Sequence, residues 1–346
     1  MKSLKKSLVH ALSMSMLIGF SANSFAELVV NSGSGGASQA KAWTTADAQQ
    51  YFNEDDDSEL SPQGSTSIST SLRRGAAVHT PKTTPSVGQV FDTRYSNNAP
   101  AISAGSALVM DAHTGEVLYS KNSSMSRPIA SITKLMTAVV TADARLNMSE
   151  TITLQPIDFD GPKKASSTLR AGDKMNRAEV LLVALMKSEN PAAAALARTY
   201  PGGKPAFVAA MNAKARQLGM VSTHYYESTG LDPRNVSSAR DLAILVSEAS
   251  KYGVIRQFSS TPHYDFNLGY RVLKSNNTNA LVRNGAWNIN LSKTGFINEA
   301  GRCVVMHTTV NARPAVVVLL GEPTTQSRNS DATNLLTWLN NLPKRI

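Results

Sequence analysis

The chain has 346 residues, 42% of them hydrophobic, a net charge of +10 and a single cysteine, Cys303. These values predict one large or two small globular domains with a hydrophobic core, and one cysteine excludes an intrachain disulfide. The positive charge favours polyanionic partners, but nucleic acid is a poor candidate because no basic run is interleaved with aromatic residues.

The N-terminal segment, residues 1–26, has the pattern of a cleaved secretory signal peptide. Lys2, Lys5 and Lys6 form a basic start, an apolar stretch covers 8–20, and small residues at 24–26 suit a signal peptidase. The apolar stretch is too short to cross ~30 Å of hydrocarbon as a stable helix. We therefore predict export to the periplasm, with no integral membrane span in the mature chain; an uncleaved membrane anchor is the alternative.

Residues 27–103 differ in composition from the rest of the chain. They contain the acidic run 54–57 and the Ser/Thr-rich run 65–70, and they have few large apolar side chains. Such a segment cannot offset the entropy lost on ordering, so we predict that it is flexible and of low complexity.

Residues 104–346 carry the periodic patterns of a folded domain. Runs that read as strands, in chain order, are 106–110, 116–119, 287–291, 303–309 and 315–320. Runs that read as helices are 131–144, 178–186, 192–198, 207–218, 239–252 and a last one capped by Asp331 that ends near Leu342. Two strands, a helical insert, three strands and a helix predict an α/β (α+β) fold, in which helices flank one antiparallel sheet of about five strands.

The first motif that suggests chemistry is Ser131-Ile132-Thr133-Lys134, at the start of a predicted helix that follows Pro128. Residues three apart share a helix face, so the Ser131 hydroxyl and the Lys134 amine are expected within hydrogen-bond reach. A serine needs an adjacent base, and Lys134 can be that base only if its pKa falls by ~3 units from about 10.4. The same spacing at Ser3–Lys6 and Ser38–Lys41 shows how weak the motif is alone.

Two further motifs follow in the chain. Ser188-Glu189-Asn190 comes directly after the apolar helix, where Ser188 can project from a rigid element or simply end the helix before Pro191. Lys293-Thr294-Gly295 lies in a strand-like run, where a residue without a side chain would let substrate lie against the strand. Each motif is weak, but this ordered triple is typical of class A β-lactamases and penicillin-binding proteins.

With these motifs, the sequence resembles the low-molecular-mass penicillin-binding proteins, and among them the D-alanyl-D-alanine endopeptidases. The resemblance spans roughly 104–342 and is carried by the segments 128–138, 185–190, 200–203, 210–215 and 293–296. It implies a β-lactamase/D,D-peptidase-like fold, peptidoglycan with crosslinked stem peptides as substrate, and β-lactams as covalent inhibitors. A polymer rich in carboxylates also suits the basic charge.

The resemblance also implies a role for each motif residue. Ser131 would attack the penultimate D-alanine carbonyl, Lys134 would accept its proton, and Ser188 would relay a proton to the departing amine, which in an endopeptidase belongs to a diaminopimelate side chain. Asn190 would hold the peptide, and Lys293 would help to lower the pKa of Lys134. The substrate-binding set implied by the resemblance is Asn190, Lys293, Thr294, Gly295 and Phe296, with the backbone N–H groups of Ser131 and Phe296 as the oxyanion hole. No cofactor or metal is expected, because the sequence lacks H-E-x-x-H and its histidines are scattered.

Three other activities share these motifs. A D,D-carboxypeptidase would use the same groups to remove terminal D-alanine. A class A β-lactamase needs a carboxylate base for deacylation, and the acidic residues between the first two motifs do not lie in an E-x-x-L-N setting. A non-enzymatic penicillin sensor or scaffold usually has membrane spans, which the predicted mature chain lacks.

Overall fold

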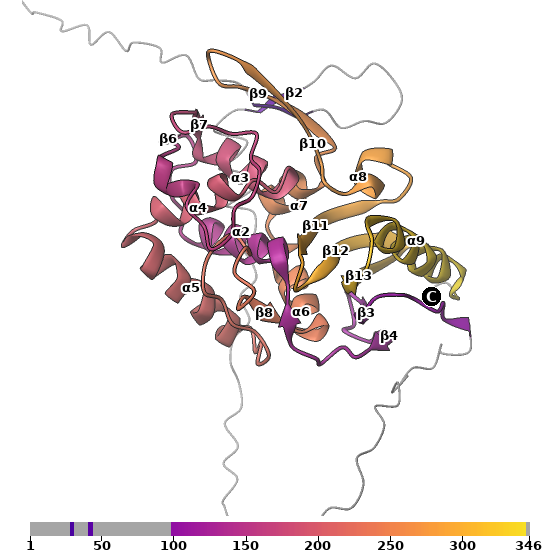
Figure 1. Cartoon of the computed structure of the whole chain (residues 1–346). Coiled ribbons are helices and arrows are strands. Elements are labelled where there is room, and N and C mark those ends of the chain that lie inside the picture. The colour runs from indigo at the N-terminus through magenta and orange to yellow at the C-terminus, as the bar shows by residue number, and fades with distance from the viewer. Residues whose placement is uncertain (1–27, 31–40, 44–97, 344–346) are drawn as a thin grey trace, which may run out of the picture.

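The computed structural model describes residues 28–30, 41–43 and 98–343 (Figure 1). The predicted signal peptide, and most of the segment predicted to be flexible, lie outside these residues. Inside that segment, β1 (Leu28–Val30) and β2 (Lys41–Trp43) pair as antiparallel strands. The backbone just before residue 104 is anchored as well, because the carbonyl of Ile102 accepts a hydrogen bond from Lys121 Nζ.

A five-stranded antiparallel sheet forms the centre of the molecule, in the order β11-β12-β13-β3-β4. The sequence predicted this sheet. Its strands are β3 (Ser106–Asp111), β4 (Val117–Lys121), β11 (Ile289–Ile297), β12 (Gly301–Val310) and β13 (Arg313–Glu322). β13 lies between β12 and β3. The two ends of the chain's folded part therefore meet in one sheet, with β11 at an edge.

Both faces of the sheet are buried, and β13 shows why. Successive side chains on a strand point to opposite faces. Val316 and Val318 belong to the core beneath the helical part, whereas Val317 and Leu319 belong to a second core with α9 (Thr325–Asn341). Figure 1 shows α9 on one side of the sheet and the helical part on the other.

The helical part comes from the chain between β4 and β11. Its main helices are α2 (Thr133–Asp143), α3 (Arg177–Met186), α4 (Asn190–Arg198), α5 (Gly203–Gln217), α6 (Ala239–Ala249) and α7 (Gly253–Ser260). α3 begins with a capping box between Asn176 and Glu179, and nearly all of its residues are buried. Because α3 is packed on all sides, the residues that follow it are held on a rigid element.

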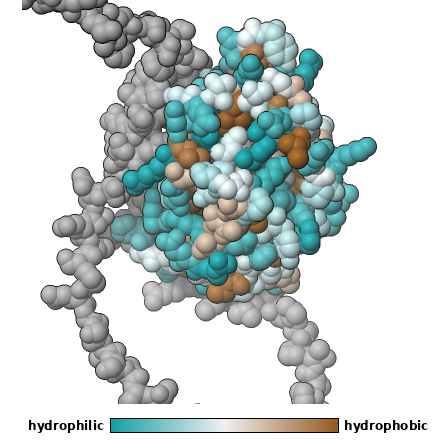
Figure 2. Space-filling view, turned by 90° about the vertical axis from the view of Figure 1, so that its left-hand side faces the viewer, coloured by the Kyte–Doolittle hydropathy of each residue, from teal (hydrophilic) through white to brown (hydrophobic). Residues whose placement is uncertain are grey.

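Short elements complete the helical part, and the sequence analysis did not predict them. They are β5 (Arg127–Pro128), the 3-10 turns η2 (Ala130–Ile132) and η3 (Pro156–Asp158), β6 (Thr151–Thr153), β7 (Lys174–Asn176), β8 (Val236–Ser237), the hairpin β9 (His263–Asn267) with β10 (Val272–Asn276), and α8 (Ala280–Asn284). In Figure 2, the surface of the helical part is mostly hydrophilic, with scattered hydrophobic patches.

The structure corrects several predicted boundaries. The strand predicted at 287–291 runs over 289–297, the helix predicted from residue 207 begins at Gly203, and the helix predicted over 239–252 ends at Ala249, before the separate helix α7. Two further corrections concern helix starts. The last helix begins at Thr325 with Thr324 as its cap, because the Thr324 hydroxyl accepts from Ser327 N; Asp331 lies inside the helix and accepts from Ser103 N and Ala104 N instead. The first helix begins at Thr133 rather than at residue 131, which lies in η2. Asp331 is therefore engaged by a distant segment of the chain, which its place in the sequence does not predict.

Candidate active site

Ser131 lies in the single 3-10 turn η2, between β5 and α2. The turn starts at Ala130, whose φ of 49° is in the left-handed region that residues with a side chain rarely adopt. The Thr133 hydroxyl donates to the Ala130 carbonyl at 2.8 Å and holds this conformation. The Ser131 side chain is only half-buried, so its hydroxyl remains accessible at the start of a buried helix.

Lys134 is the first charged residue of α2, and its side chain is only 1% exposed. Its Nζ donates to Ser131 Oγ at 2.9 Å, to Asn190 Oδ1 at 2.7 Å and to the Thr229 carbonyl at 2.7 Å. Burial lowers the pKa of Lys134 to about 7, whereas the nearby carboxylates of Glu227 and Glu189 act to raise it. A substantial fraction of this amine is therefore neutral near pH 7.

The three contacts of Lys134 determine where its lone pair points when the amine is neutral. A neutral amine has two N–H donors and one lone pair, whereas a charged ammonium has three donors. The Asn190 amide oxygen and the Thr229 carbonyl can only accept hydrogen bonds, so they hold the two remaining N–H groups. The lone pair then faces the Ser131 hydroxyl, which is the orientation that a general base needs.

Ser188 and Asn190 lie in the tight turn between α3 and α4. Ser188 has a φ of 66°, and Asn190 is the first residue of α4, with Glu189 as its cap. The alternative that Pro191 ends the preceding helix is wrong: α3 stops at Met186, and Pro191 lies in the first turn of α4. This turn contacts both lysines, because Asn190 binds Lys134 and Ser188 accepts from Lys293 Nζ at 2.8 Å.

Lys293 reaches the site from β11, and it is also 1% exposed. Its Nζ donates to Ser188 Oγ and to the Thr294 carbonyl at 2.9 Å. Burial is the main cause that lowers its pKa well below the ordinary value, followed by the positive charges of Lys134 and Arg328. The two lysines therefore lie close enough to repel each other, and carrying both charges at once is unfavourable.

The backbone of β11 lies directly against the turn that carries Ser131. A Cβ atom added to Gly295 would lie 3.0 Å from the Ile129 carbonyl oxygen and 3.0 Å from Ser131 N. Thr294 and Phe296 flank this glycine: the Thr294 hydroxyl donates to Thr278 Oγ1 at 2.6 Å, and Phe296 is 44% exposed. The structure thus brings together all eight residues named from the three motifs.

The loop 227–235 also belongs to the site, and the sequence analysis missed it. The Glu227 carboxylate accepts from the backbone N–H groups of Thr229 and Gly230 and from Asn235 Nδ2. These bonds present the Thr229 carbonyl to Lys134. Gly230 has a φ of 87°, and a Cβ there would lie 1.9 Å from the Ala130 oxygen. The only signal in the sequence was a run of turn-forming residues between two predicted helices.

Arg328 and Glu189 were not singled out from the sequence either. Arg328 is buried at the start of α9 and contributes to the low pKa of Lys293. Glu189 accepts from the Ser167 hydroxyl at 2.5 Å and from Thr168 N at 3.1 Å, which ties the 158–173 loop to the turn carrying Ser188. Within the residues that the structure describes, no three His, Cys, Asp or Glu side chains gather in a way that could hold a metal ion.

The family model for D-alanyl-D-alanine carboxypeptidases, peptidase S11, matches residues 93–324. The chain belongs to the peptidase S11 family. This S11 peptidase is 48% identical over 245 residues to a D-alanyl-D-alanine endopeptidase of Pseudomonas aeruginosa, covering 69% of the chain and 77% of that relative. A D-alanyl-D-alanine endopeptidase of Escherichia coli is 44% identical over 242 residues, covering 69% of the chain and 78% of the relative.

Solved structures agree with this assignment. The Streptomyces K15 DD-transpeptidase superposes with a TM-score of 0.65 at 29% identity, covering 70% of this S11 peptidase and 98% of that enzyme. A penicillin-binding protein homologue from Mycobacterium tuberculosis gives a TM-score of 0.66 at 26% identity, covering 72% and 95% of the two chains. The predicted fold class is confirmed, and the protein is a serine-type D-Ala-D-Ala peptidase, a hydrolase. Peptidoglycan as substrate and β-lactam binding fit this family.

None of the helices in the described part of the chain has both the length and the apolar character needed to cross a bilayer.

Proposed function

We propose that this S11 peptidase is a periplasmic D,D-endopeptidase that hydrolyses D-alanyl crosslinks in peptidoglycan through an acyl-enzyme on Ser131. The observation that carries the chemistry is the contact of a buried Lys134, with a pKa of about 7, with the Ser131 hydroxyl at 2.9 Å. The choice of an endopeptidase rests on the two relatives of that name at 48% and 44% identity.

In the proposed acylation step, Ser131 Oγ attacks the carbonyl carbon of the D-alanine residue while its proton passes to neutral Lys134. The tetrahedral intermediate collapses with cleavage of the C–N bond. The departing amine takes a proton from the Ser188 hydroxyl, and Lys293, which donates to Ser188 Oγ at 2.8 Å, stabilises the charge that develops there. Lys134 then passes the proton that it took from Ser131 to Ser188, which restores the Ser188 hydroxyl and the neutral amine. In deacylation, neutral Lys134 takes a proton from the attacking water, the water oxygen bonds to the ester carbonyl carbon, and Lys134 returns that proton to Ser131 Oγ as the ester C–O bond breaks.

The binding roles follow from positions on β11 and on the turn before α4. Asn190 uses its amide oxygen for Lys134, so its amide N–H₂ group is the part proposed to hold the acyl-donor peptide backbone. Lys293 and Thr294 are proposed to bind the carboxylate on the leaving-group side. Gly295 leaves room for the substrate, and the N–H groups of Ser131 and Phe296 are proposed to form the oxyanion hole.

A periplasmic location requires that the chain be exported, so the proposal extends to the N-terminal part of the chain. We propose that residues 1–26 direct export and are removed, that 27–103 form a flexible segment, and that 104–346 form the peptidase domain. The positive net charge of +10 supports attraction to a wall polymer that carries carboxylates.

The second candidate function is a D,D-carboxypeptidase, supported by relatives of that name such as one from Salmonella typhimurium at 31% identity. Incubation with crosslinked muropeptide dimers and with pentapeptide monomers separates the two activities. We expect the wild type to release monomers from dimers, and Ser131→Ala to release none. Loss of terminal D-alanine without opening of dimers would contradict the endopeptidase proposal.

Benzylpenicillin tests the acyl-enzyme step separately. We expect a stable adduct on Ser131, detected as a mass increase of the intact protein, and no adduct on Ser131→Ala. Rapid hydrolysis of penicillin with no accumulating adduct would point to a β-lactamase instead.

A further inference from the structure

Asn235 is the last residue of the loop 227–235, and its side chain is completely buried. A buried amide has two N–H donors and a carbonyl oxygen that need partners, so its hydrogen bonds show which parts of the molecule it holds together. The partners of Asn235 lie in two segments that are far apart in the chain, the loop itself and the turn that carries Ser131. The function proposed above gives this residue no role.

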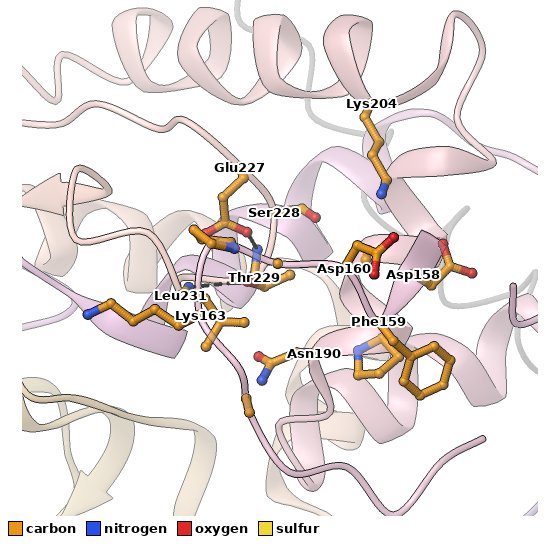
Figure 3. A pocket seen from close by; sticks show the side chains of 15 residues that line it. Asp158, Phe159, Asp160, Lys163, Asn190, Lys204, Glu227, Ser228, Thr229 and Leu231 are labelled. Carbon is orange, nitrogen blue, oxygen red and sulfur yellow. Dashed lines mark hydrogen bonds between the residues drawn. The ribbon is translucent and has the colours of Figure 1, made fainter. Parts of the chain in front are cut away.

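On the loop side, Asn235 fixes the position of Glu227. Its Oδ1 accepts from the backbone N–H groups of Tyr226 at 2.7 Å and Glu227 at 3.3 Å. Its Nδ2 donates to the Glu227 carbonyl at 2.9 Å and to Glu227 Oε1 at 3.0 Å. In Figure 3, the Glu227 carboxylate lies against Thr229 of the same loop, whose carbonyl accepts from Lys134. Asn235 therefore orients the carboxylate that presents this carbonyl to Lys134.

On the other side, Asn235 contacts the turn that carries the nucleophile at two points. Its Nδ2 donates to Thr133 Oγ1 at 3.2 Å, and the Thr133 hydroxyl in turn donates to the Ala130 carbonyl at 2.8 Å. Its backbone carbonyl accepts from Ile129 N at 3.2 Å. Hydrogen bonds in series strengthen one another, so the conformation of Ala130, directly before Ser131, is coupled to the Asn235 amide.

The loop has other attachments that do not depend on Asn235. The Thr137 hydroxyl of α2 donates to the Ser228 carbonyl at 2.7 Å, and the Ser228 hydroxyl donates to the Ala193 carbonyl of α4 at 3.0 Å. These contacts keep the loop on the helical part of the molecule. Loss of the Asn235 amide is therefore expected to shift the loop and the turn relative to each other rather than to unfold the domain.

We propose that Asn235 is a positioning residue, which aligns the Ser131 hydroxyl with the Lys134 amine by holding the turn and the loop against each other. This inference rests on the proposed acyl-enzyme on Ser131. The role needs a donor and an acceptor on one short side chain, because Asn235 binds N–H groups with its oxygen and the oxygens of Glu227 and Thr133 with its nitrogen. An aspartate has the same shape but lacks the N–H donors, which makes it the informative replacement.

Asn235→Ala tests the alignment by separating binding from chemistry. Stopped-flow acylation by benzylpenicillin gives the dissociation constant of the first complex and the rate constant for acylation. We expect the rate constant to fall about 10²-fold, as for a misplacement of about 1 Å at reacting groups, while the dissociation constant changes by less than about threefold. A change mainly in the dissociation constant would contradict a positioning role.

Asn235→Asp gives the sharper readout, and it preserves the size of the side chain if Asn235→Ala does not fold. It places a carboxylate oxygen where the amide nitrogen contacts Glu227 Oε1 at 3.0 Å. Two carboxylates this close share one proton, so the aspartate can donate like the amide at low pH and repels Glu227 at high pH. The other charged groups near position 235 are Asp232, which is paired with Arg234, and the Lys134 amine of α2.

The measured quantity is the acylation rate of Asn235→Asp divided by that of the wild type at the same pH. We expect this ratio to lie within about threefold of one near pH 5.5 and to fall at least about tenfold by about pH 9. A purely electrostatic effect of the added charge gives the opposite trend. The extra negative charge would raise the pKa of Lys134 and slow acylation most at low pH, so the ratio would rise with pH.

Asn212→Asp is the matched control. Asn212 of α5 holds the backbone just before the loop, because its Nδ2 donates to the Tyr225 carbonyl at 2.7 Å and its Oδ1 accepts from Tyr225 N at 2.9 Å. Among the described residues, its side chain has no hydrogen bond to the turn that carries Ser131. An aspartate there also lacks the N–H donors, so stability in urea is expected to fall with rising pH while the acylation rate stays at the wild-type value.

The outcomes distinguish this inference from the proposed function. A ratio for Asn235→Asp that is constant or rises with pH would overturn the positioning role and leave the acyl-enzyme in place, and so would an equal fall in Asn212→Asp. Unfolding of Asn235→Asp, measured by circular dichroism over the same pH range as the loss of rate, would also overturn it, since residue 235 would then hold the domain as a whole. A wild-type protein that forms no adduct on Ser131 would overturn the proposed function and this inference with it.

Discussion

Gly230→Ala is the substitution for which the structure gives the sharpest expectation. Gly230 has a φ of 87°, where an L-residue costs about 1–2 kcal/mol. The added methyl carbon would also lie 1.9 Å from the Ala130 oxygen and 2.9 Å from Ser131 N. Both neighbours are backbone atoms of the turn that carries the proposed nucleophile, so no side-chain rotation can relieve the overlap.

The overlap can be relieved only if the loop and the turn move apart by about 1 Å, because real contacts of a methyl carbon lie beyond about 3 Å. A displacement of 1 Å at reacting groups can reduce a rate about 10²-fold. We therefore expect Gly230→Ala to lose about 2–4 kcal/mol in the free energy of unfolding, from backbone strain and steric overlap together. The rate constant for acylation by benzylpenicillin is expected to fall about 10²-fold.

Gly219→Ala provides the matched control. Gly219 has a similar φ of 73°, but a Cβ there would have no neighbour within 4 Å. We expect a loss of about 1–2 kcal/mol from backbone strain and a wild-type acylation rate. Urea unfolding and stopped-flow acylation measure the two quantities. If both variants lose the same stability and both acylate at the wild-type rate, the contact between the loop and the turn has no role in catalysis.

Three further expectations follow from the same geometry. Because Lys134 must be neutral to accept a proton and has a pKa of about 7, the rate of acylation should rise tenfold per pH unit below that value and level off above it. Glu227→Gln removes a negative charge that raises this pKa, so it should shift the rise to lower pH. A pH–rate profile that does not shift in this variant would contradict the assignment of Lys134 as the base. Gly295→Ala should slow acylation by about tenfold and lower the free energy of unfolding by less than about 1.5 kcal/mol, because the new Cβ would lie 3.0 Å from Ser131 N and needs only a small shift of the backbone. A wild-type rate would mean that β11 moves aside without displacing the turn that carries Ser131. Arg198→Ala should lower the free energy of unfolding in urea by about 3–5 kcal/mol, because it leaves the buried Asp158 carboxylate without its cation. A loss below about 1 kcal/mol would show that Asp158 does not depend on Arg198.

The sequence was sufficient to predict the sheet and the identity of the motif residues. The strand at 315–320 could be recognised because both faces of β13 are buried against cores that only apolar side chains can fill, so its sequence is a continuous apolar run. The spacing of Ser131 and Lys134 was also sufficient, because residues three positions apart lie on the same side of a 3-10 turn that runs into a helix, much as they do in a helix alone.

The details of the site could not be predicted, because they depend on contacts between distant segments. The left-handed conformation of Ala130 is held by Thr133 and by the close approach of Gly230, one hundred residues along the chain. A residue with a side chain disfavours a positive φ, so no pattern of neighbouring residues predicts this conformation at Ala130. The hairpin of β9 and β10 is different: Tyr264, Phe266 and Leu273 alternate with exposed residues, and this signal was present in the sequence but was not used.

The turn that carries Ser131 is enclosed by main chain on two sides, at Gly230 and at Gly295. Main-chain atoms are common to every amino acid, so a point mutation cannot reshape these walls in small increments; it either leaves them intact or displaces them. Evolution of a new substrate preference in such an enzyme is therefore confined to the rim, where loops such as 158–165 can exchange one side chain for another without disturbing the reacting atoms.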